Sequence, residues 1–597
     1  MTKMMVSDYV LNFLVNKKVK KVFLITGGAI SFQVDAFARN NKITYVSVGH
    51  EQAAAMMADS YSRIGPNFSC TMVTSGPGAT NLLTGIACSY FDSIPSLHIC
   101  GQVNTYEQQE SHYSTKKVRQ VGFQETDIVS MAKPITKFSY KIKKAEEVQY
   151  ILEKSYYIAT SGRPGPVLID IPMDIQKKII DLKKTKVFLP SKIKIRSFEK
   201  EIYRSINFIK KSKRPVLVLG GGIKYSKSNL ILKKFLKNFN IPIVTTWSGV
   251  DLLDHEDIRY IGNVGVYGSR SANFAVQNSD CILCLGSRLD TRVTGGVPKN
   301  FAREAKKIVV DIDKYELNKK RGLVVDIKIN LDLKDFFNQF AKINNFYFDK
   351  KDWMEKCQIW KNNYPIVDKK YFNQKKYTNP YVFFDFLSKI LNKKDIIIAD
   401  DGGHLTWCIQ AFKVKYGQKL FSAFGNSPMG YALPASIGAS VANKNSRIIC
   451  IDGDGSIQIN LQELHTISKL KIPIKIFVLN NNCYGIIKQF QELYLEKRYE
   501  ASGKGVTNPD FKKISKSFEI PYSLIKNKKD FNKIKEKINN NKPHFFEILL
   551  KPDQKIIPKL QFGNPLEDMS PVLNRNEFLN NMIVKTIGRN KKIFEAN

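Results

Sequence analysis

The segment from Asp452 to Asn482 constrains the fold of this 597-residue chain more than any other stretch. An apolar strand, RIICI, ends in Asp-Gly-Asp-Gly, and a helical pattern follows, which indicates a strand, a tight turn and a helix. A second apolar strand, IPIKIFVL, then leads to Asn480–Asn482. Because a crossover returns the second strand parallel to the first, we expect both polar turns at one edge of a sheet.

The two turns carry the residues of a metal and diphosphate site. Gly453 and Gly455 let the backbone approach a ligand closely, and the following helix offers unpaired N–H groups to an anion. Asp454 and Asn481 supply the oxygen ligands that Mg²⁺ prefers, and the backbone carbonyl of Cys483 can complete the protein's share. Turn formation alone is the alternative for a bare Gly-Asp-Gly, but the downstream strand ending in Asn-Asn favours the metal site.

Short apolar strands alternate with helical patterns along most of the chain, which predicts an α/β protein with three doubly wound domains built on parallel sheets. The predicted domains span residues 1–185, 195–345 and 378–556. A mostly irregular tail, 557–597, follows them.

Composition narrows the class of protein. The net charge of +39 comes from lysines spread along the whole chain, which argues against nucleic acid as a partner. No apolar run approaches the roughly 18 residues of a membrane span, and the N-terminus lacks a secretory leader, so we expect a cytoplasmic protein without a membrane partner. Nine cysteines, an odd number in apolar segments, indicate reduced buried thiols, including Cys281 and Cys284 of the one CxxC.

The chain resembles a known family at this point. Asn481 lies 27 positions after Asp454, and this separation is similar to that of the GDG…NN motif of thiamine diphosphate enzymes. The segments MVTSGPGATNLLTGIACSYFDSIPSLHICGQV, GFQETDIV and TSGRPGPVLIDIP resemble acetohydroxyacid synthase, also called acetolactate synthase. The resemblance covers roughly residues 1–555.

This resemblance implies thiamine diphosphate and Mg²⁺ as cofactors, held between a pyrimidine-binding first domain and a diphosphate-binding third domain. It also implies 2-keto acid substrates, a homodimer or tetramer with active sites between subunits, a possible regulatory subunit, and a place in branched-chain amino acid biosynthesis.

Site residues follow from the same resemblance. Glu51 in YVSVGHEQAAAMMADSYSR would be the catalytic acid that activates the cofactor pyrimidine, because thiamine chemistry needs a carboxyl group there. Gly28, Phe123 and Gln124 would face the cofactor and substrate from the neighbouring subunit. The third domain would add cofactor contacts from His404, Ser427, Met429, Gly453, Gly455, Ser456 and Gly485.

The central domain resembles the flavin-binding part of the same family. GVYG and GSRLDTRVTGG look like its flavin-contacting segments, so FAD without a net redox role is expected. Thr291 stands where the family has a second Asp. The implied contacts are Arg163, Gly221, Gly268, Arg288, Asp290, Arg292 and Asp311, whose arginine forks and glycine backbone suit a diphosphate.

Two departures leave the acceptor substrate open. Gly403 replaces a glutamine, and Phe490 replaces the tryptophan that selects the acceptor in biosynthetic enzymes. The main prediction is an acetolactate synthase that joins two pyruvates with loss of CO₂. The alternative is a carboligase that transfers the two-carbon unit to another carbonyl, such as a keto-sugar in surface polysaccharide synthesis.

Overall fold

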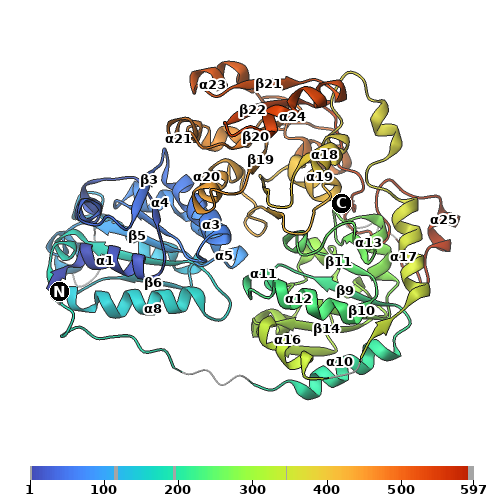
Figure 1. The fold of residues 1–597 in the computed structure, drawn as a ribbon, viewed down its shortest axis with the longest axis horizontal. Coiled ribbons are helices and arrows are strands. Elements are labelled where there is room, and N and C mark those ends of the chain that lie inside the picture. Colours follow the sequence, from blue (N-terminus) through green and yellow to red (C-terminus); the bar gives the residue numbers. More distant parts are fainter. Residues whose placement is uncertain (1–2, 113–117, 192–195, 344–345, 589–597) are drawn as a thin grey trace.

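Three six-stranded parallel sheets, each covered by helices, make up the computed structural model, which describes residues 3–112, 118–191, 196–343 and 346–588 (Figure 1). The predicted α/β fold class with three doubly wound domains is confirmed. Buried strands such as PVLVL and CILCL are apolar on both faces, as expected for parallel strands covered by helices on both sides.

The first sheet has the strand order β3-β2-β4-β5-β7-β6. Its strands are β2 (Lys21–Leu24), β3 (Thr44–Ser47), β4 (Cys70–Val73), β5 (Leu97–Gln102), β6 (Phe138–Lys141) and β7 (Val167–Pro172). The longer helices are α1 (Val6–Asn16), α3 (Glu51–Ile64), α5 (Leu83–Asp92) and α8 (Val148–Thr160). A separate antiparallel pair, β1 (Lys3–Met5) and β8 (Ile179–Asp181), joins the two ends of the domain.

The third sheet repeats this order as β18-β17-β19-β20-β22-β21. Its strands are β17 (Ile396–Ala399), β18 (Lys419–Phe421), β19 (Ile448–Gly453), β20 (Lys475–Asn480), β21 (Tyr522–Ile525) and β22 (His544–Leu549). Its helices include α18 (Pro380–Ile390), α19 (Gly403–Ala411), α20 (Ala432–Ala442), α21 (Glu463–Lys469), α22 (Gly485–Tyr494), α23 (Phe511–Ser517) and α24 (Phe531–Asn539). In both sheets the chain direction reverses beside the first strand, which is where ligands bind in open α/β sheets.

The central sheet has the order β12-β11-β9-β13-β14-β15, the doubly wound order of dinucleotide-binding domains. Its strands are β9 (Pro215–Leu219), β11 (Ile243–Thr245), β12 (Tyr260–Asn263), β13 (Cys281–Leu285), β14 (Lys306–Asp311) and β15 (Ile327–Asn330). Helices α10 (Glu199–Lys211), α12 (Asn229–Phe235), α13 (Arg270–Gln277), α16 (Leu333–Ala341) and α17 (Lys351–Asn363) pack around it. Its reversal point lies between β9 and β13.

The tail returns from the third domain to the central domain. It is irregular, as predicted, apart from α25 (Arg575–Asn580), but it is well packed. Leu560, Leu566 and Phe578 enter the apolar core of the central domain. The Arg270 guanidinium donates to the Pro571 carbonyl at 2.6 Å, and the Asn278 amide donates to the Asn581 carbonyl at 2.9 Å.

Helices α3 and α20 pack against each other and join the first and third domains (Figure 1). A Cβ at Gly438 would lie 2.1 Å from the Met57 carbonyl oxygen, so only glycine permits this approach. Beside it, the buried Arg63 guanidinium lies 2.7 Å from Asp59 and 2.8 Å from Asp92. The Tyr431 hydroxyl donates to Asp59 at 2.6 Å, which ties the third domain to this ion-pair network.

All nine cysteines have free, buried thiols, as expected from their apolar surroundings. Cys281 and Cys284 lie in β13, where burial raises the pKa of each thiol to about 12. In the part of the chain that the structure describes, no helix has the length and hydropathy needed to cross a membrane.

Replacing Arg63 with Met should lower the stability of the protein by roughly 3–5 kcal/mol, because Asp59 and Asp92 would lose their buried counter-charge. The midpoint of thermal unfolding, followed by circular dichroism, measures the loss. Arg498→Met is the matched control, since its ion pair with Glu496 is largely exposed and should contribute little. Equal midpoints for the two variants would contradict the structural role of Arg63.

Candidate active site

The carboxyl ends of β19 and β20 bring the two predicted polar turns together. The strands pair in register from Ile449 with Lys475 to Gly453 with Leu479, so both turns leave the sheet at the same edge. Asp454 and Asn481 are 4% and 6% exposed there. Cys483 follows at 4% exposure, and its thiol donates to the Pro552 carbonyl rather than into the site, at 3.2 Å.

Two of the predicted glycines permit close packing at this edge. A Cβ at Gly455 would lie 2.3 Å from the Tyr484 ring, and one at Gly485 would lie 2.6 Å from the Asn481 amide nitrogen. Any side chain would therefore displace a residue of the site. The Ser456 hydroxyl donates to the Asp452 carboxylate and so holds the turn after β19 in place.

Asp454 fits the role of a metal ligand. Burial raises the pKa of its carboxyl to about 6, although a hydrogen bond from Asn508 opposes the shift. Among the described residues no lysine, arginine or histidine lies within ion-pair distance of it, so a bound cation would compensate its charge. The Asn508 amide donates at 2.7 Å to Asp454 and at 3.1 Å to the Asn482 side chain, and so links the two turns.

Asn508 was not predicted from the sequence. It lies 54 positions after Asp454 in a segment without regular secondary structure. The only local signal is the Asn-Pro pair at 508–509, which predicts a turn and nothing more.

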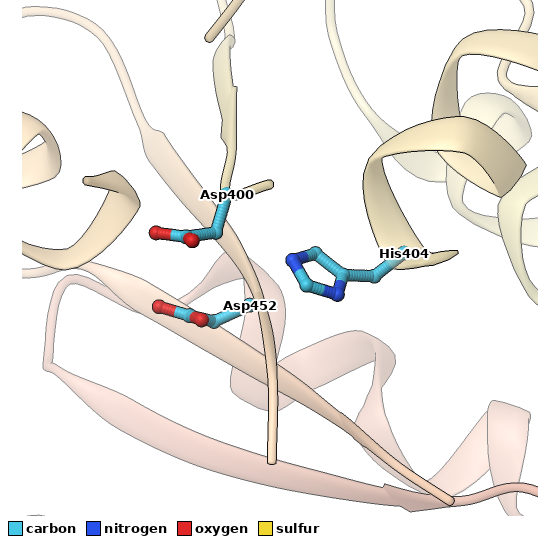
Figure 2. Close-up of side chains that lie close together, drawn as sticks. All are labelled: Asp400, His404 and Asp452. Atoms are coloured by element: carbon cyan, nitrogen blue, oxygen red, sulfur yellow. The ribbon is translucent and has the colours of Figure 1, made fainter. Parts of the chain in front are cut away.

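A buried pair of carboxylates lies beneath the turn of β19 (Figure 2). Asp400, after β17, and Asp452, at the end of β19, point their carboxylates in the same direction, and the His404 ring faces both. Burial and the charge of Asp452 raise the pKa of Asp400 well above its usual range, and burial raises the pKa of Asp452 to about 7. Burial and mutual repulsion therefore disfavour a state in which both carboxylates are charged.

His404 is held neutral in this surrounding. Burial lowers the pKa of its ring to about 3. Its Nε2 atom has no hydrogen-bond partner within the described residues, while a Cβ at Gly453 would lie 2.7 Å from the ring. The ring therefore lies near Gly453, where the sequence predicts a diphosphate site. A buried polar atom without a partner there fits the predicted contact between His404 and a bound cofactor.

The loop with Ser427 and Met429 is fixed by acceptors from two domains. Asp400 accepts the backbone N–H groups of Gly430 at 2.9 Å and Ala432 at 2.6 Å, just after Met429. Before Ser427, the Asp92 carboxylate of the first domain accepts the N–H groups of Phe424 at 3.0 Å and Gly425 at 2.8 Å.

Within that loop, Ser427 adopts a left-handed conformation, with φ of 53°. Its hydroxyl donates to Asp401 at 2.5 Å. Met429 is half-buried. The loop therefore holds the Ser427 backbone carbonyl and the Met429 side chain in fixed positions near Asp400, at the carboxyl end of β17.

The predicted residues of the first domain gather at the reversal point of their own sheet. Glu51 begins α3, and its carboxylate accepts from the Asn81 amide at 2.9 Å. Gln124, with φ of 64°, packs against Gly76, where a Cβ would lie 2.9 Å from the Gln124 side chain. Gly28 is open to solvent and Phe123 is 84% exposed.

The sites of the first and third domains are thus two separate groups at the edges of two sheets. The hydrogen bond of Glu51 stays within its own domain. A phenylalanine as exposed as Phe123 is unusual unless a partner covers it.

The central domain carries a large cleft at the reversal point of its sheet. Six of the seven residues predicted to contact flavin line it, namely Arg163, Gly221, Arg288, Asp290, Arg292 and Asp311. Gly268 is buried outside the lining, where a Cβ would lie 2.4 Å from the Asn263 carbonyl oxygen.

Its geometry fits a long ligand with a phosphate-rich middle. Gly221 and Gly222 keep the turn after β9 free of side chains. Arg163, which reaches across from the first domain, pairs with Asp313 at 3.0 Å and Glu316 at 3.2 Å. The Arg292 guanidinium lies 5.2 Å from the Trp247 ring, which leaves a flat apolar wall beside a charge.

The two predicted departures have local structural consequences. A Cβ at Gly403 would lie 3.0 Å from the Trp407 ring, so the ring packs where a larger residue would stand. Phe490 lies in α22, directly after the metal turns, with its ring 4.9 Å from that of Tyr494 and 5.8 Å from that of Phe562. Phe562 lies in the tail, so no local sequence pattern links it to Phe490.

Comparison with known proteins places this geometry in a class. Residues 4–131 match the family described as "Thiamine pyrophosphate enzyme, N-terminal TPP binding domain". Residues 202–340 match its central domain, and residues 400–548 match its C-terminal TPP binding domain. The chain is therefore a thiamine pyrophosphate enzyme.

Curated relatives narrow the class further. The acetolactate synthase large subunit of Cyanidium caldarium is 34% identical over 583 residues, which cover 94% of this chain and 95% of the relative. That of Lactococcus lactis is 31% identical over 565 residues, 94% and 95% of the two chains. The mitochondrial acetolactate synthase catalytic subunit of Saccharomyces cerevisiae is 32% identical, over 92% and 81%. The chain belongs to the acetolactate synthase family.

Replacing Asp454 with Asn should remove Mg²⁺-dependent retention of thiamine diphosphate, because an amide cannot supply the anionic oxygen. Asn508→Ala should weaken it roughly 10- to 100-fold, as is typical when a residue that orients a metal ligand is lost. Equilibrium dialysis with varied Mg²⁺ measures both changes. Asn541→Ala, at an exposed position, is the control, and retention equal to that control in both variants would contradict the metal site.

Proposed function

We propose that this protein is an acetolactate synthase that decarboxylates one pyruvate and joins the remaining two-carbon unit to a second pyruvate. The observation that carries this proposal is the convergence of Asp454, Asn481 and His404 with the Ser427–Met429 loop in a chain of this family. When bound, thiamine diphosphate supplies the electron sink that lets a 2-keto acid lose CO₂. Asp454 and Asn481 would hold Mg²⁺ against its diphosphate.

The chain's own residues would position the rest of the cofactor. The hydrogen bond from Asn81 occupies Oε2 of Glu51 and leaves Oε1 available to hold a proton at the pyrimidine ring nitrogen. The Ser427 carbonyl would accept a hydrogen bond from the ring amino group. Met429 would fill the space beneath the cofactor and exclude water, which would otherwise release the two-carbon unit as an aldehyde.

A complete site would need two chains. Glu51 and the exposed Phe123 lie at a different sheet edge from Met429, so a homodimer that brings the first domain of one chain to the third domain of its partner would complete two sites. Burying Phe123 in that interface would contribute about 1.5–3 kcal/mol per chain. The relatives are named as large or catalytic subunits, which supports a possible regulatory subunit for this chain.

FAD is the second cofactor that we propose, in the cleft of the central domain. Gly221 would allow its diphosphate to approach the turn after β9. Arg288 and Arg292 would offset the phosphate charge. The half-buried Asp311, whose pKa is raised by partial burial, would accept hydrogen bonds from a ribose. Its role would be structural, since joining two keto acids needs no net electron transfer.

With thiamine diphosphate and Mg²⁺ present, pyruvate alone should yield acetolactate and CO₂ in equal amounts. Colorimetric detection of acetoin, after acid decarboxylation of the product, measures it. The aromatic group of Phe490, Tyr494 and Phe562 makes the acceptor worth testing with a keto-sugar as well. Release of CO₂ only when the keto-sugar is added would overturn the synthase assignment and favour the second carboligase activity.

A Glu51→Gln variant tests whether Glu51 takes part in the reaction or only supports the fold. It should retain thiamine diphosphate but lose most of the activity, because general acid–base catalysis typically contributes about 10²–10⁴-fold. Gln149→Glu, a change of the opposite sense on α8, should leave activity unaltered. Full activity of Glu51→Gln would remove Glu51 from the mechanism.

The purified protein should be yellow, with a flavin absorption spectrum. Gly222→Val should release the flavin, since a Cβ at Gly222 would lie only 2.9 Å from Gly286 and close the turn. Flavin fluorescence in the filtrate after ultrafiltration measures the release. A colourless protein that does not take up added FAD would contradict the assignment of the cleft.

A further inference from the structure

A second cavity lies where all three domains meet, and none of the predicted site residues lines it. The first domain contributes Arg63, the central domain Lys224 and Lys227, and the third domain Lys419. The cavity volume is about 490 Å³, within the roughly 300–1,000 Å³ of typical ligand pockets. It adjoins the flavin cleft, with which it shares Ser93, Pro164 and Tyr225. Domain interfaces are common places for small-molecule sites.

The charges that line this junction cavity are unbalanced. Asp251 is the only carboxylate among the described residues that line it. Its side chain accepts from Lys224 at 2.8 Å and from the Leu420 N–H at 3.1 Å. Arg63 is paired with Asp59 and Asp92. Within the described residues no carboxylate lies within ion-pair distance of Lys227 or Lys419. Lys227 therefore has no carboxylate partner there, and Lys419 shares the charge of Asp251 with Lys224.

The environment of Lys419 favours an added anion. Lys419 is exposed at the cavity wall. Partial burial lowers the pKa of this lysine, Asp251 opposes that shift, and the weaker effect of Lys224 adds to it. A bound anion would add a second counter-charge beside Asp251.

The lining offers both charge and aromatic surface. Lysine ammonium groups are compact point charges that commonly bind phosphate. The one arginine here is already engaged by two carboxylates. Tyr156, Tyr225 and Tyr416 also line the cavity and offer aromatic surface next to the lysines.

We propose that the junction cavity binds a phosphorylated small molecule of nucleotide size, with its phosphates at Lys227 and Lys419 and its base against the tyrosines. Such a ligand would contact all three domains at once. It would stabilise their present arrangement by mass action, beside the Arg63 network that joins the first and third domains.

Calorimetric titration of ADP into the enzyme, saturated with thiamine diphosphate, Mg²⁺ and FAD, tests this proposal. We expect one site per chain, and weaker binding of inorganic pyrophosphate, which lacks the base. Lys419→Gln and Lys227→Gln should each weaken ADP binding by about tenfold or more, the effect of losing one hydrogen bond to a charged group. Lys512→Gln, an exposed lysine of α23 outside the cavity, should bind ADP like the unaltered protein.

Several outcomes would overturn the proposal. Absence of ADP binding, or binding that neither cavity variant weakens while both retain the unaltered melting temperature, would remove the site. Release of flavin by ADP, seen as a rise in flavin fluorescence, would place the nucleotide in the flavin cleft instead. Equal affinities for ADP and pyrophosphate would exclude recognition of a base.

Discussion

The backbone from Phe424 to Ala432 is held between carboxylates of two different domains, and the rest of the candidate active site depends on that constraint. Asp92 of the first domain accepts the N–H groups at the start of this segment, and Asp400 of the third domain accepts those at its end. Asp92 is itself held by Arg63. A left-handed serine and a half-buried methionine can keep one conformation because both ends of their loop are tied to buried charge.

The buried ion-pair network of Arg63, Asp59 and Asp92 adds little net stability but fixes the local geometry. Burying Arg63, Asp59 and Asp92 removes three charged groups from water, and an apolar set of similar volume would often be as stable or more so. The charged residues instead fix geometry, because each carboxylate accepts hydrogen bonds from specific N–H and O–H donors. We infer that the network is kept because it sets the register of α3 against α20. It thereby also sets the position of the segment from Phe424 to Ala432 relative to the first domain.

Sequence reasoning predicted what depends on local pattern. Apolar strands ending in Gly-Asp-Gly and Asn-Asn indicated a parallel sheet and located Asp454 and Asn481 at one edge, because strand register follows from topology. It did not find Asn508, which reaches Asp454 from an irregular segment, or Asp401, whose bond to Ser427 depends on how two distant loops meet. Resemblance supplied Glu51 and the flavin residues, of which Gly268 alone lies outside the cleft lining. The role of each of these residues remains a prediction.

The tail gives the central domain a second attachment to the third, because it continues from the third domain and docks noncovalently on the central one. One connection enters through residues 364–378, and the other returns through residues 551–575 before α25 docks beside α13. A body attached at a single point can swing and twist freely, whereas one attached at two points can turn only about the line between them. Any opening of the cleft in the central domain is therefore restricted to one axis, and Phe562, which lies in the tail, would move against Phe490 when the cleft opens.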